Sequence, residues 1–324
     1  MRTTHRIISV LAAMCVAGAA LAQGAKDFPS RPIRLVVSFA PGGTADTVGR
    51  IVGEGLSERL GQPVIADNRP GANSVLACGI VAQSNPDGHT MVIVAAGFAV
   101  NPSLRKKLPY DSLRDFVPVG LAGTGPYLLS THPSVPAKTL KEFIAWAKAR
   151  PGQVNYASTG IGSPPHLAAE LLNSMAGLQT VQIPYKGGGS VLPDLLAGRV
   201  SFFFGSVSTL GSHIRAGRLR GIGVTTLKRV SSMPELATFD ESGLKGYEVT
   251  GWYGILAPGK TPRAIVNRLN TELRHAVGDS QIQKRLRARG IDPAPITAEE
   301  FAALLRREIP KWAKVMKAAG IEPQ

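Results

Sequence analysis

Two glycine-rich turns are the stretches of this chain whose residue types could do chemistry. The first, Pro41-Gly42-Gly43, follows an apolar run from Ile33 to Ser38 and precedes a helical pattern. A helix start leaves backbone N–H groups unpaired and carries about half a positive charge, so glycines that let a ligand approach create an anion site without a cation. We expect Thr44 to cap this helix. An ordinary strand-to-helix turn that binds nothing stays open as the alternative.

The second turn repeats this design further along the chain. A strand pattern from Val154 to Ala157 runs into Ser158–His166, where Ser163 can cap the next helix and Pro164 suits its first position. Two such sites, one in each half of the molecule, would face each other across a cleft, and a ligand held by both would favour closure. A third glycine-rich segment contains Lys186, which either lends its charge to an anion at the cleft or is a solvated loop residue.

A phosphate-loop pattern, G-x-x-x-x-G-K-T, spans Gly254–Thr261. In a working loop the first glycine ends the strand, whereas here the apolar run continues to Ala257, and Pro258 lacks the N–H group that a phosphate would need. We therefore expect no nucleotide site.

Catalytic arrangements are poorly supported. Ser163 and His166 could form a hydrolase pair only if the fold brought an acidic residue beside them, and a packing role for His166 is favoured. The histidines lack metal-ligand spacing, and Cys78 fits a small buried position. The sequence predicts no catalytic residue, no cofactor and no metal site.

Residues Met1–Ala22 have the pattern of a secretory signal peptide: two arginines, an apolar stretch, and small residues before an expected cleavage near Ala22. A lipid anchor on Cys15 is the less favoured alternative, because Met14 is too large for that kind of cleavage site. No later segment has the roughly 20 apolar residues that a membrane helix needs. The mature protein is predicted to be periplasmic.

The charge balance favours anionic ligands. Removing the signal peptide takes away two arginines and lowers the formal net charge from +15 to +13. The C-terminal region is rich in arginine, but acidic residues interrupt it and no aromatic ladder accompanies it. We expect a solvated basic face and no nucleic-acid partner.

Strand and helix patterns alternate along the chain, which predicts an α/β fold with mainly parallel sheets flanked by helices and ligands at the carboxyl ends of the strands. Glycines around Pro126 mark a crossing between lobes, and Gly246–Leu256 marks the return. Residues 23–123 and 247–324 would form lobe 1, and residues 124–246 lobe 2. The further predicted strands are Pro63–Asp67, Thr90–Ala96, Phe116–Ala122, Tyr127–Thr131, Thr180–Ile183, Val200–Phe204 and Gly221–Thr225.

Helix faces and caps follow from spacing. Apolar positions predict two buried faces, one at Val48, Ile51, Val52, Leu56 and Leu60 and one at Leu167, Leu171, Leu172 and Met175. Capping boxes are predicted at Thr139 with Glu142 and at Thr297 with Glu300, and Thr261-Pro262 should cap and begin another helix.

Seven ordered motifs carry a family resemblance: Pro41-Gly42-Gly43 with Asp46, Asn68-Arg69-Pro70-Gly71-Ala72, Pro86-Asp87-Gly88, Leu108-Pro109-Tyr110-Asp111, Tyr156-Ala157-Ser158, Gly160-x-Gly162-Ser163-x-x-His166 and Tyr185-Lys186-Gly187. From about Phe28 to Ile321 the chain resembles the Bug-type periplasmic solute receptors of tripartite tricarboxylate transporters.

This resemblance implies a two-lobed, flytrap-like (type II-like) periplasmic binding protein without catalytic activity. It implies a monomer that holds a small organic acid in its cleft and is recognised by membrane permease subunits. One ligand carboxylate would be bound, partly through waters, by the loops Pro41–Asp46 and Thr159–Ser163. The ligand-binding residues implied are Phe39, Pro41, Gly42, Gly43, Thr44, Asp46, Phe98, Tyr127, Thr159, Gly162, Ser163, His166, Lys186 and Gly205.

One departure from the family pattern concerns the ligand. Many relatives have an acidic residue near Gly205, where this chain reads Phe203-Phe204-Gly205-Ser206. An amino-acid ligand is therefore less expected than a mono- or dicarboxylate without an amino group. A sensor input protein for a carboxylate and a hydrolase stay open as alternatives.

Overall fold

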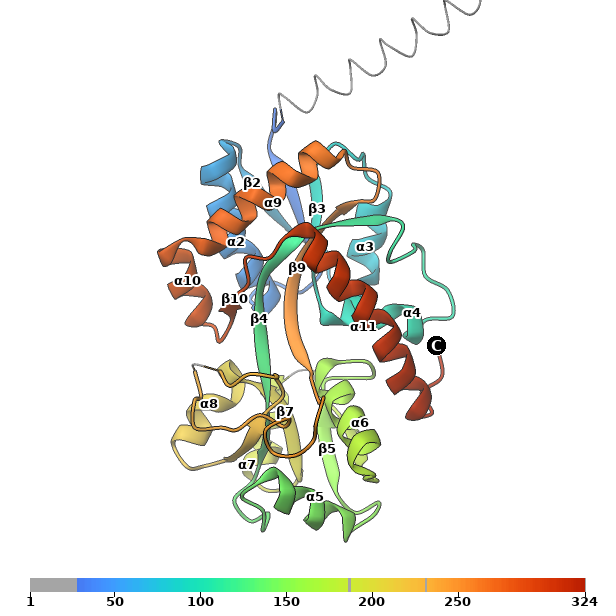
Figure 1. The fold of residues 1–324 in the computed structure, drawn as a ribbon, viewed down its shortest axis with the longest axis vertical. Coiled ribbons are helices and arrows are strands. Elements are labelled where there is room, and N and C mark those ends of the chain that lie inside the picture. The colour runs from blue at the N-terminus through green and yellow to red at the C-terminus, as the bar shows by residue number, and fades with distance from the viewer. Residues whose placement is uncertain (1–27, 186–187, 231, 324) are drawn as a thin grey trace, which may run out of the picture.

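The computed structural model describes residues 28–185, 188–230 and 232–323, in which helices flank one mixed ten-stranded sheet (Figure 1). The main path of the sheet is β2-β1-β3-β9-β4-β7-β5-β6, and β8 and β10 each pair with β4. The strands are β1 (Ile33–Val37), β2 (Val64–Asn68), β3 (Thr90–Ala95), β4 (Phe116–Thr131), β5 (Asn155–Ser158), β6 (Val181–Pro184), β7 (Phe202–Ser206), β8 (Arg220–Val224), β9 (Thr250–Pro258) and β10 (Asp292–Pro293).

Helices and short helical turns connect these strands. They are α2 (Thr44–Leu60), η1 (Ala72–Ser74), α3 (Val75–Ala82), η2 (Ala96–Ala99), α4 (Asn101–Leu104), α5 (Leu140–Lys148), α6 (Pro164–Ala176), α7 (Gly188–Leu196), α8 (Val207–Arg215), α9 (Arg263–Gly278), α10 (Ser280–Arg287) and α11 (Ala298–Ala318).

Parallel pairing is confined to the outer strands of each half. In one half β1 lies between β2 and β3, and in the other β5 lies between β6 and β7, with all four pairs parallel. The strands that connect the halves pair antiparallel: β9 with β3, and β4 with β9, β7 and β8. The predicted alternation of strand and helix is thus confirmed, with an antiparallel centre added to it.

Two long strands, β4 and β9, run from one half of the molecule to the other (Figure 1). They pair from Phe116↔Pro258 to Pro126↔Thr250, and β4 then continues along β7 to Thr131. The predicted break of β4 into two strands is therefore wrong. Its glycines serve close contacts, since a Cβ atom on Gly123 would collide with Ile291 and with the backbone of Asp292 on β10.

Burial follows the predicted helix faces with one exception. Val48, Ile51, Val52, Leu56 and Leu60 of α2 are all buried. In α6, however, Met175 is 37% exposed, so its predicted burial is wrong. The buried stripe of α6 continues to Ala176 instead and leaves Met175 at its margin.

Caps fix where the helices begin. The capping box of Thr297 and Glu300 is confirmed at the start of α11. At α5 Thr139 accepts from the Glu142 N–H as predicted, but the Glu142 carboxylate accepts from the Lys138 N–H and not from that of Thr139, so this box is only half formed.

Helix α9 begins later than predicted. Its capping position is Pro262 and its first helical residue is Arg263, so the prediction that Thr261 caps it and Pro262 begins it is wrong. The Thr261 hydroxyl donates instead to the Pro258 carbonyl.

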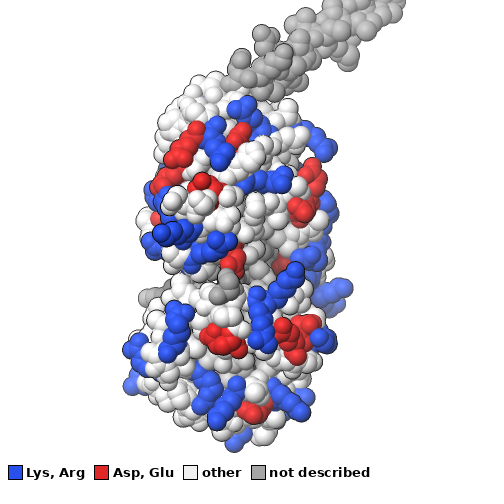
Figure 2. All heavy atoms as spheres, turned by 60° about the vertical axis from the view of Figure 1, so that its left-hand side comes forward, with Lys and Arg blue, Asp and Glu red and all other residues white. Residues whose placement is uncertain are grey.

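On the face shown in Figure 2, basic residues lie on both halves of the molecule with acidic residues among them. Several arginines of the C-terminal helices are paired, such as Arg263 with Glu299 and Arg285 with Glu54. In the described part of the chain, no helix combines the length and the apolar character required to cross a bilayer.

Candidate functional site

A cleft of about 560 Å³ lies between the two halves, beside Tyr127 of β4 and Tyr253 of β9. Its walls come from the β1–α2 turn, from η1 and η2, and from the loops that lead into α6 and α8. The lining residues are Phe39, Ala40, Pro41, Gly43, Thr44, Ala45, Asn73, Ala95, Gly97, Tyr127, Thr159, Pro164, Pro165, Phe203, Phe204, Gly205, Ser206, Thr209 and Tyr253.

The first glycine turn presents the start of α2 to this cleft. Gly42 has φ +80°, a conformation that favours glycine, and Gly43 occupies the capping position without any side chain to cap the helix. The first intrahelical bond runs from Thr47 N–H to the Gly43 carbonyl, so the N–H groups of Thr44, Ala45 and Asp46 precede it. These donors are left for a ligand because no capping side chain takes them.

Thr44 itself does not cap the helix, so that prediction is wrong. It is the first helical residue, one position past the cap, and its side chain is hydrogen-bonded to Tyr253 of β9. Burial raises the pKa of Tyr253 to about 12, and this hydrogen bond only partly opposes the rise. The phenol therefore stays protonated and available as a donor.

The second glycine turn differs from the first in the donors that it offers. The first two residues of α6 are Pro164 and Pro165, which have no N–H group. The Gly162 N–H donates to His166 Nδ1 at 3.0 Å, and the Leu167 N–H donates to the Ser163 carbonyl. Only the His166 N–H remains at this helix start, and the cleft wall here consists of Thr159 and the two prolines.

The geometry of Ser163 and His166 does not suit hydrolysis. The Ser163 hydroxyl is buried without a hydrogen-bond partner among the described residues, and it makes no side-chain cap. His166 Nδ1 is occupied as an acceptor, and burial holds the pKa of this histidine below its usual value. His166 therefore has the packing and hydrogen-bonding role that the sequence favoured.

Several residues expected at the ligand lie behind the cleft wall. Phe98 is fully buried against Tyr110 and Phe116, so it does not line the cleft. Asp46 is buried beneath the first turn, and its carboxylate accepts at 2.9 Å the N–H of Gly42, an exposed residue of that turn that does not line the cleft. Neither Gly162, Ser163 nor His166 lines the cleft, because α6 presents its prolines there. Lys186 lies outside the described residues.

Two tyrosines on the connecting strands form part of the cleft lining. Tyr127 of β4 and Tyr253 of β9 both line it, and burial raises the pKa of Tyr127 well above its usual value. Beside them Ser206 caps α8, accepting the Thr209 N–H, and both hydroxyl residues face the cleft. Of the described residues that line the cleft, none is acidic, basic or a histidine.

Sequence reasoning missed Asn73, Thr209 and Tyr253 as lining residues. Asn73 belongs to three consecutive non-glycine residues with positive φ, at +47°, +54° and +75° from Ala72 to Ser74. The preference of asparagine for this conformation was a usable signal. Tyr253 lies on the predicted return strand, but its face depends on a register that the sequence does not show.

The phosphate-loop pattern is not a phosphate site. β9 continues through Gly254, where a Cβ atom would collide with Phe301, and the Gly259 N–H donates to the Asp115 carbonyl. Cys78 is fully buried, and burial raises the pKa of its thiol to about 12. Within the described residues there is no cluster of His, Cys, Asp and Glu that could hold a metal ion.

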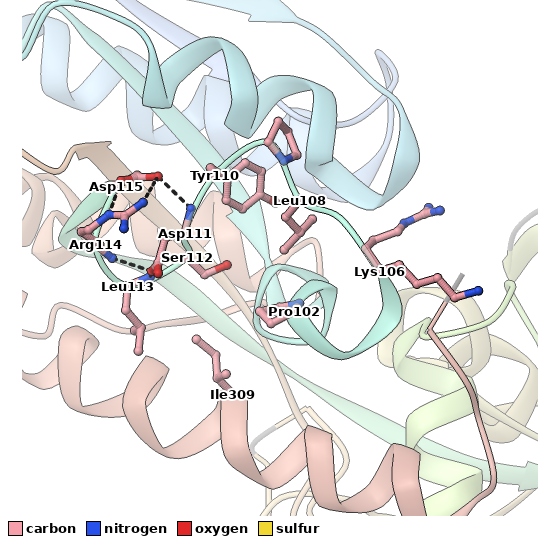
Figure 3. Close-up of a pocket in the computed structure, with 12 residues that line it drawn as sticks. Pro102, Lys106, Leu108, Tyr110, Asp111, Ser112, Leu113, Arg114, Asp115 and Ile309 are labelled. Atoms are coloured by element: carbon pink, nitrogen blue, oxygen red, sulfur yellow. Dashed lines mark hydrogen bonds and ion pairs between the residues drawn. The ribbon is translucent and has the colours of Figure 1, made fainter.

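A second hollow of about 610 Å³ lies away from the glycine turns, between the loop before β4 and α11 (Figure 3). Part of its charge is paired locally, since Arg114 pairs with Asp115 and the Asp115 carboxylate also accepts the Asp111 N–H, whereas Arg105 and Lys106 line it as basic residues. Leu113 lies beside Ile309 at its edge. Neither glycine turn contributes a residue to this hollow.

The fold and the cleft define a two-lobed solute-binding protein of the periplasmic type. Comparison with known families makes this specific, since residues 48–321 match the model described as "Tripartite tricarboxylate transporter family receptor". The chain belongs to this family, and it is a receptor and not an enzyme.

Relatives of known sequence and structure agree with this placement. Protein BugT of Bordetella pertussis is 34% identical over 318 residues, covering 97% of this chain and 98% of BugT. Rpa4515 of R. palustris, solved with adipate, is 35% identical with a TM-score of 0.79, covering 92% of this chain and 100% of that one. MatC of Rhodopseudomonas palustris, solved with bound malate, is 32% identical with a TM-score of 0.74, covering 89% of this chain and 99% of that one.

Proposed function

We propose that this protein captures a small organic carboxylate in the cleft between its lobes and delivers it to a tripartite tricarboxylate transporter. The observation that carries the proposal is the start of α2, which no side chain caps and whose first residues Thr44 and Ala45 line the cleft. Adipate and malate in the two related structures are both carboxylates, which supports the same ligand class here.

The ligand would be held asymmetrically. The start of α2 takes one carboxylate through backbone donors and the helix dipole, while the start of α6 contributes its dipole and the loop before it the Thr159 hydroxyl. Tyr127 and Tyr253 supply phenol donors, and Phe39 supplies apolar surface.

We infer that the ligand carries no ammonium group. An α-amino acid needs an anion or several acceptors to replace the water around its ammonium, because an unpaired charge in a cleft is costly. The described cleft lining holds no carboxylate, and the nearby Asp46 is already bonded to three donors. The ligand class favoured is therefore a mono- or dicarboxylate without an amino group.

The same proposal includes the biological setting. The signal peptide would be cleaved near Ala22, and a monomeric receptor would meet permease subunits after closing on its ligand. Lobe 1 would comprise residues 23–123 and 247–324, and lobe 2 residues 124–246, with β4 and β9 as the connections that bend. Amino-terminal sequencing of the exported protein checks the cleavage position.

A thermal-shift panel tests the ligand class. Adipate, malate, benzoate and phenylacetate are compared with aspartate and glutamate, and adipamide and benzamide serve as neutral controls. Binding adds RT ln(1 + [L]/Kd) to stability, about 2.7 kcal/mol at a hundredfold excess over Kd, so a true ligand gives a clear rise in melting temperature. We expect a rise for at least one plain carboxylate and none for the amides.

Two results would contradict the proposal in different ways. If no carboxylate raised the melting temperature and mass spectrometry found no acid copurifying with the protein, the carboxylate receptor assignment would be wrong. If aspartate or glutamate alone raised it, the receptor assignment would stand and the inference about the missing ammonium group would fall.

A further inference from the structure

We propose that Asp46, Arg50 and Asn68, called here the Asp46 cluster, set the affinity of the cleft by holding the first glycine turn in place without touching the ligand. This inference rests on the proposed function of that turn. It assigns Asp46 the role of a positioning residue, in place of the ligand contact expected from the sequence.

Hydrogen bonds join the cluster to both sides of the turn. The Asp46 carboxylate accepts the Gly42 N–H at 2.9 Å, and the Asn68 amide nitrogen donates to the Phe39 carbonyl at 3.0 Å and to Asp46 Oδ1 at 2.8 Å. Phe39 and Gly42 flank Ala40 and Pro41, which both line the cleft. Two side chains thereby hold the Phe39–Ala40 and Pro41–Gly42 peptide groups.

Arg50 completes the cluster from the outer surface. Its Nε donates to Asp46 Oδ1 at 3.0 Å, and its Nη2 donates to Asn68 Oδ1 at 2.9 Å. The Asp46 side chain is only 5% exposed, whereas that of Arg50 is 48% exposed. A buried carboxylate next to an anion site would repel the ligand, and Arg50 offsets that charge from the side away from the cleft.

The protonation state of Asp46 agrees with this arrangement. Burial alone would raise the pKa of its carboxyl, but the hydrogen bonds from Asn68, Arg50 and the Gly42 N–H hold the pKa below its usual value. The carboxylate stays charged and keeps its role as an acceptor. None of the three side chains lines the cleft, so any effect on affinity must pass through the turn.

This cluster suggests a function for one sequence motif, Asn68-Arg69-Pro70-Gly71-Ala72. Asn68 ends β2 directly opposite Val37 at the end of β1, and the Arg69 N–H donates to the Val37 carbonyl. The end of β2 is thereby held in register with the strand that leads into the turn. An asparagine at this position can reach both Phe39 and Asp46.

Asp46→Asn is the first test. The new amide oxygen can still accept from Gly42, but its nitrogen then opposes Asn68 or Arg50, which are both donors. We expect Kd for the best carboxylate of the panel above to rise at least about tenfold, the size of a lost charge-assisted bond. We also expect faster hydrogen–deuterium exchange in a peptide spanning residues 39–46 and unchanged exchange across residues 155–163.

Asp67→Asn is the matched control. Asp67 is the neighbour of Asn68 on β2, and its carboxylate bonds two arginines, Arg34 and Arg69, and no residue of the turn. The same change of charge should leave Kd within about twofold of the wild type. Arg50→Gln is a milder variant at a half-exposed position, and it should raise Kd about two- to fivefold without loss of folding.

Each outcome decides the proposal. A higher Kd with faster exchange at residues 39–46 in Asp46→Asn, and neither in Asp67→Asn, supports it. An unchanged Kd, an equal rise in both variants, or a higher Kd without faster exchange overturns it. If Asp46→Asn does not fold, Arg50→Gln decides in its place. If the wild type binds no carboxylate, the proposed function fails, whereas exchange still reports whether the cluster holds the turn.

Discussion

Replacing Gly43 with aspartate should raise stability and weaken ligand binding together. Gly43 caps α2 at φ −71° and ψ 166°, and a Cβ atom there would meet only the Ala40 carbonyl at 3.4 Å, so a side chain is accommodated without strain. An aspartate at the capping position would accept the N–H of Ala45 or Asp46, which are the donors offered to the ligand. Its charge would also repel a bound carboxylate.

The magnitudes follow from elementary electrostatics. Two unit charges about 5 Å apart repel by about 1 to 3 kcal/mol for effective dielectric constants between 80 and 20, which corresponds to about a 5- to 150-fold rise in Kd. Capping and the helix dipole act in the opposite direction on folding and add a few tenths to about 1 kcal/mol of stability. Gly43→Asn is the matched control, because it caps the helix without adding charge.

Calorimetric titration with the best carboxylate, together with melting of the unliganded protein, checks this prediction. We expect Kd to rise in the order wild type, Gly43→Asn, Gly43→Asp, and melting temperature not to fall in either variant. Equal Kd values for the aspartate and asparagine variants would refute the reasoning, since the ligand's charge would then not lie at this helix start.

Three further predictions concern residues around the cleft. Burial lowers the pKa of His166 below 6.5, so this histidine contributes stability that is present above that pH and is lost as pH falls through the folded pKa. The free energy of unfolding, measured in urea, should therefore fall less between pH 7 and pH 5 in His166→Gln than in the wild type. Gly97→Ala should destabilise the fold by about 1–3 kcal/mol in the same assay, because its Cβ would lie 2.5 Å from Asn73 Oδ1. Lys260→Ala should leave carboxylate affinity unchanged in calorimetric titration, because Lys260 does not line the cleft; nucleotide binding by the wild type that this substitution abolished would revive the phosphate-loop hypothesis.

The alternation of elements was readable from the sequence because it depends on local pattern. The apolar run from Ile33 and the three- and four-residue spacing of α2 follow from side-chain period alone. The continuity of β4 was not readable, since Gly123 and Gly125 signal a turn by local rules. Only the approach of β10 and Ile291, distant in sequence, explains why these positions lack side chains.

The residues of the site also divide into those that local sequence pattern predicts and those that depend on contacts distant in sequence. Pro41, Gly43 and Thr159 lie at predicted turns, and the structure places them at the cleft. Asp46 was expected there too, because its motif lies at the turn, but which way its side chain points depends on Asn68 from another strand. Tyr253 reaches the cleft through the pairing of β9 with β4, which no local pattern specifies.

The sequence itself shows that the two glycine turns differ in the number of backbone N–H donors that they can offer to a ligand. Both have a strand, glycines and a helix start, but the residues that follow are Thr44-Ala45 in one and Pro164-Pro165 in the other. A helix start binds an anion through its free N–H groups, and proline has none. Two prolines at the first positions leave α6 with its dipole and the His166 N–H, while α2 keeps its full set of donors. The residue types just after a glycine turn, more than the glycines themselves, therefore decide how strongly it can hold a carboxylate.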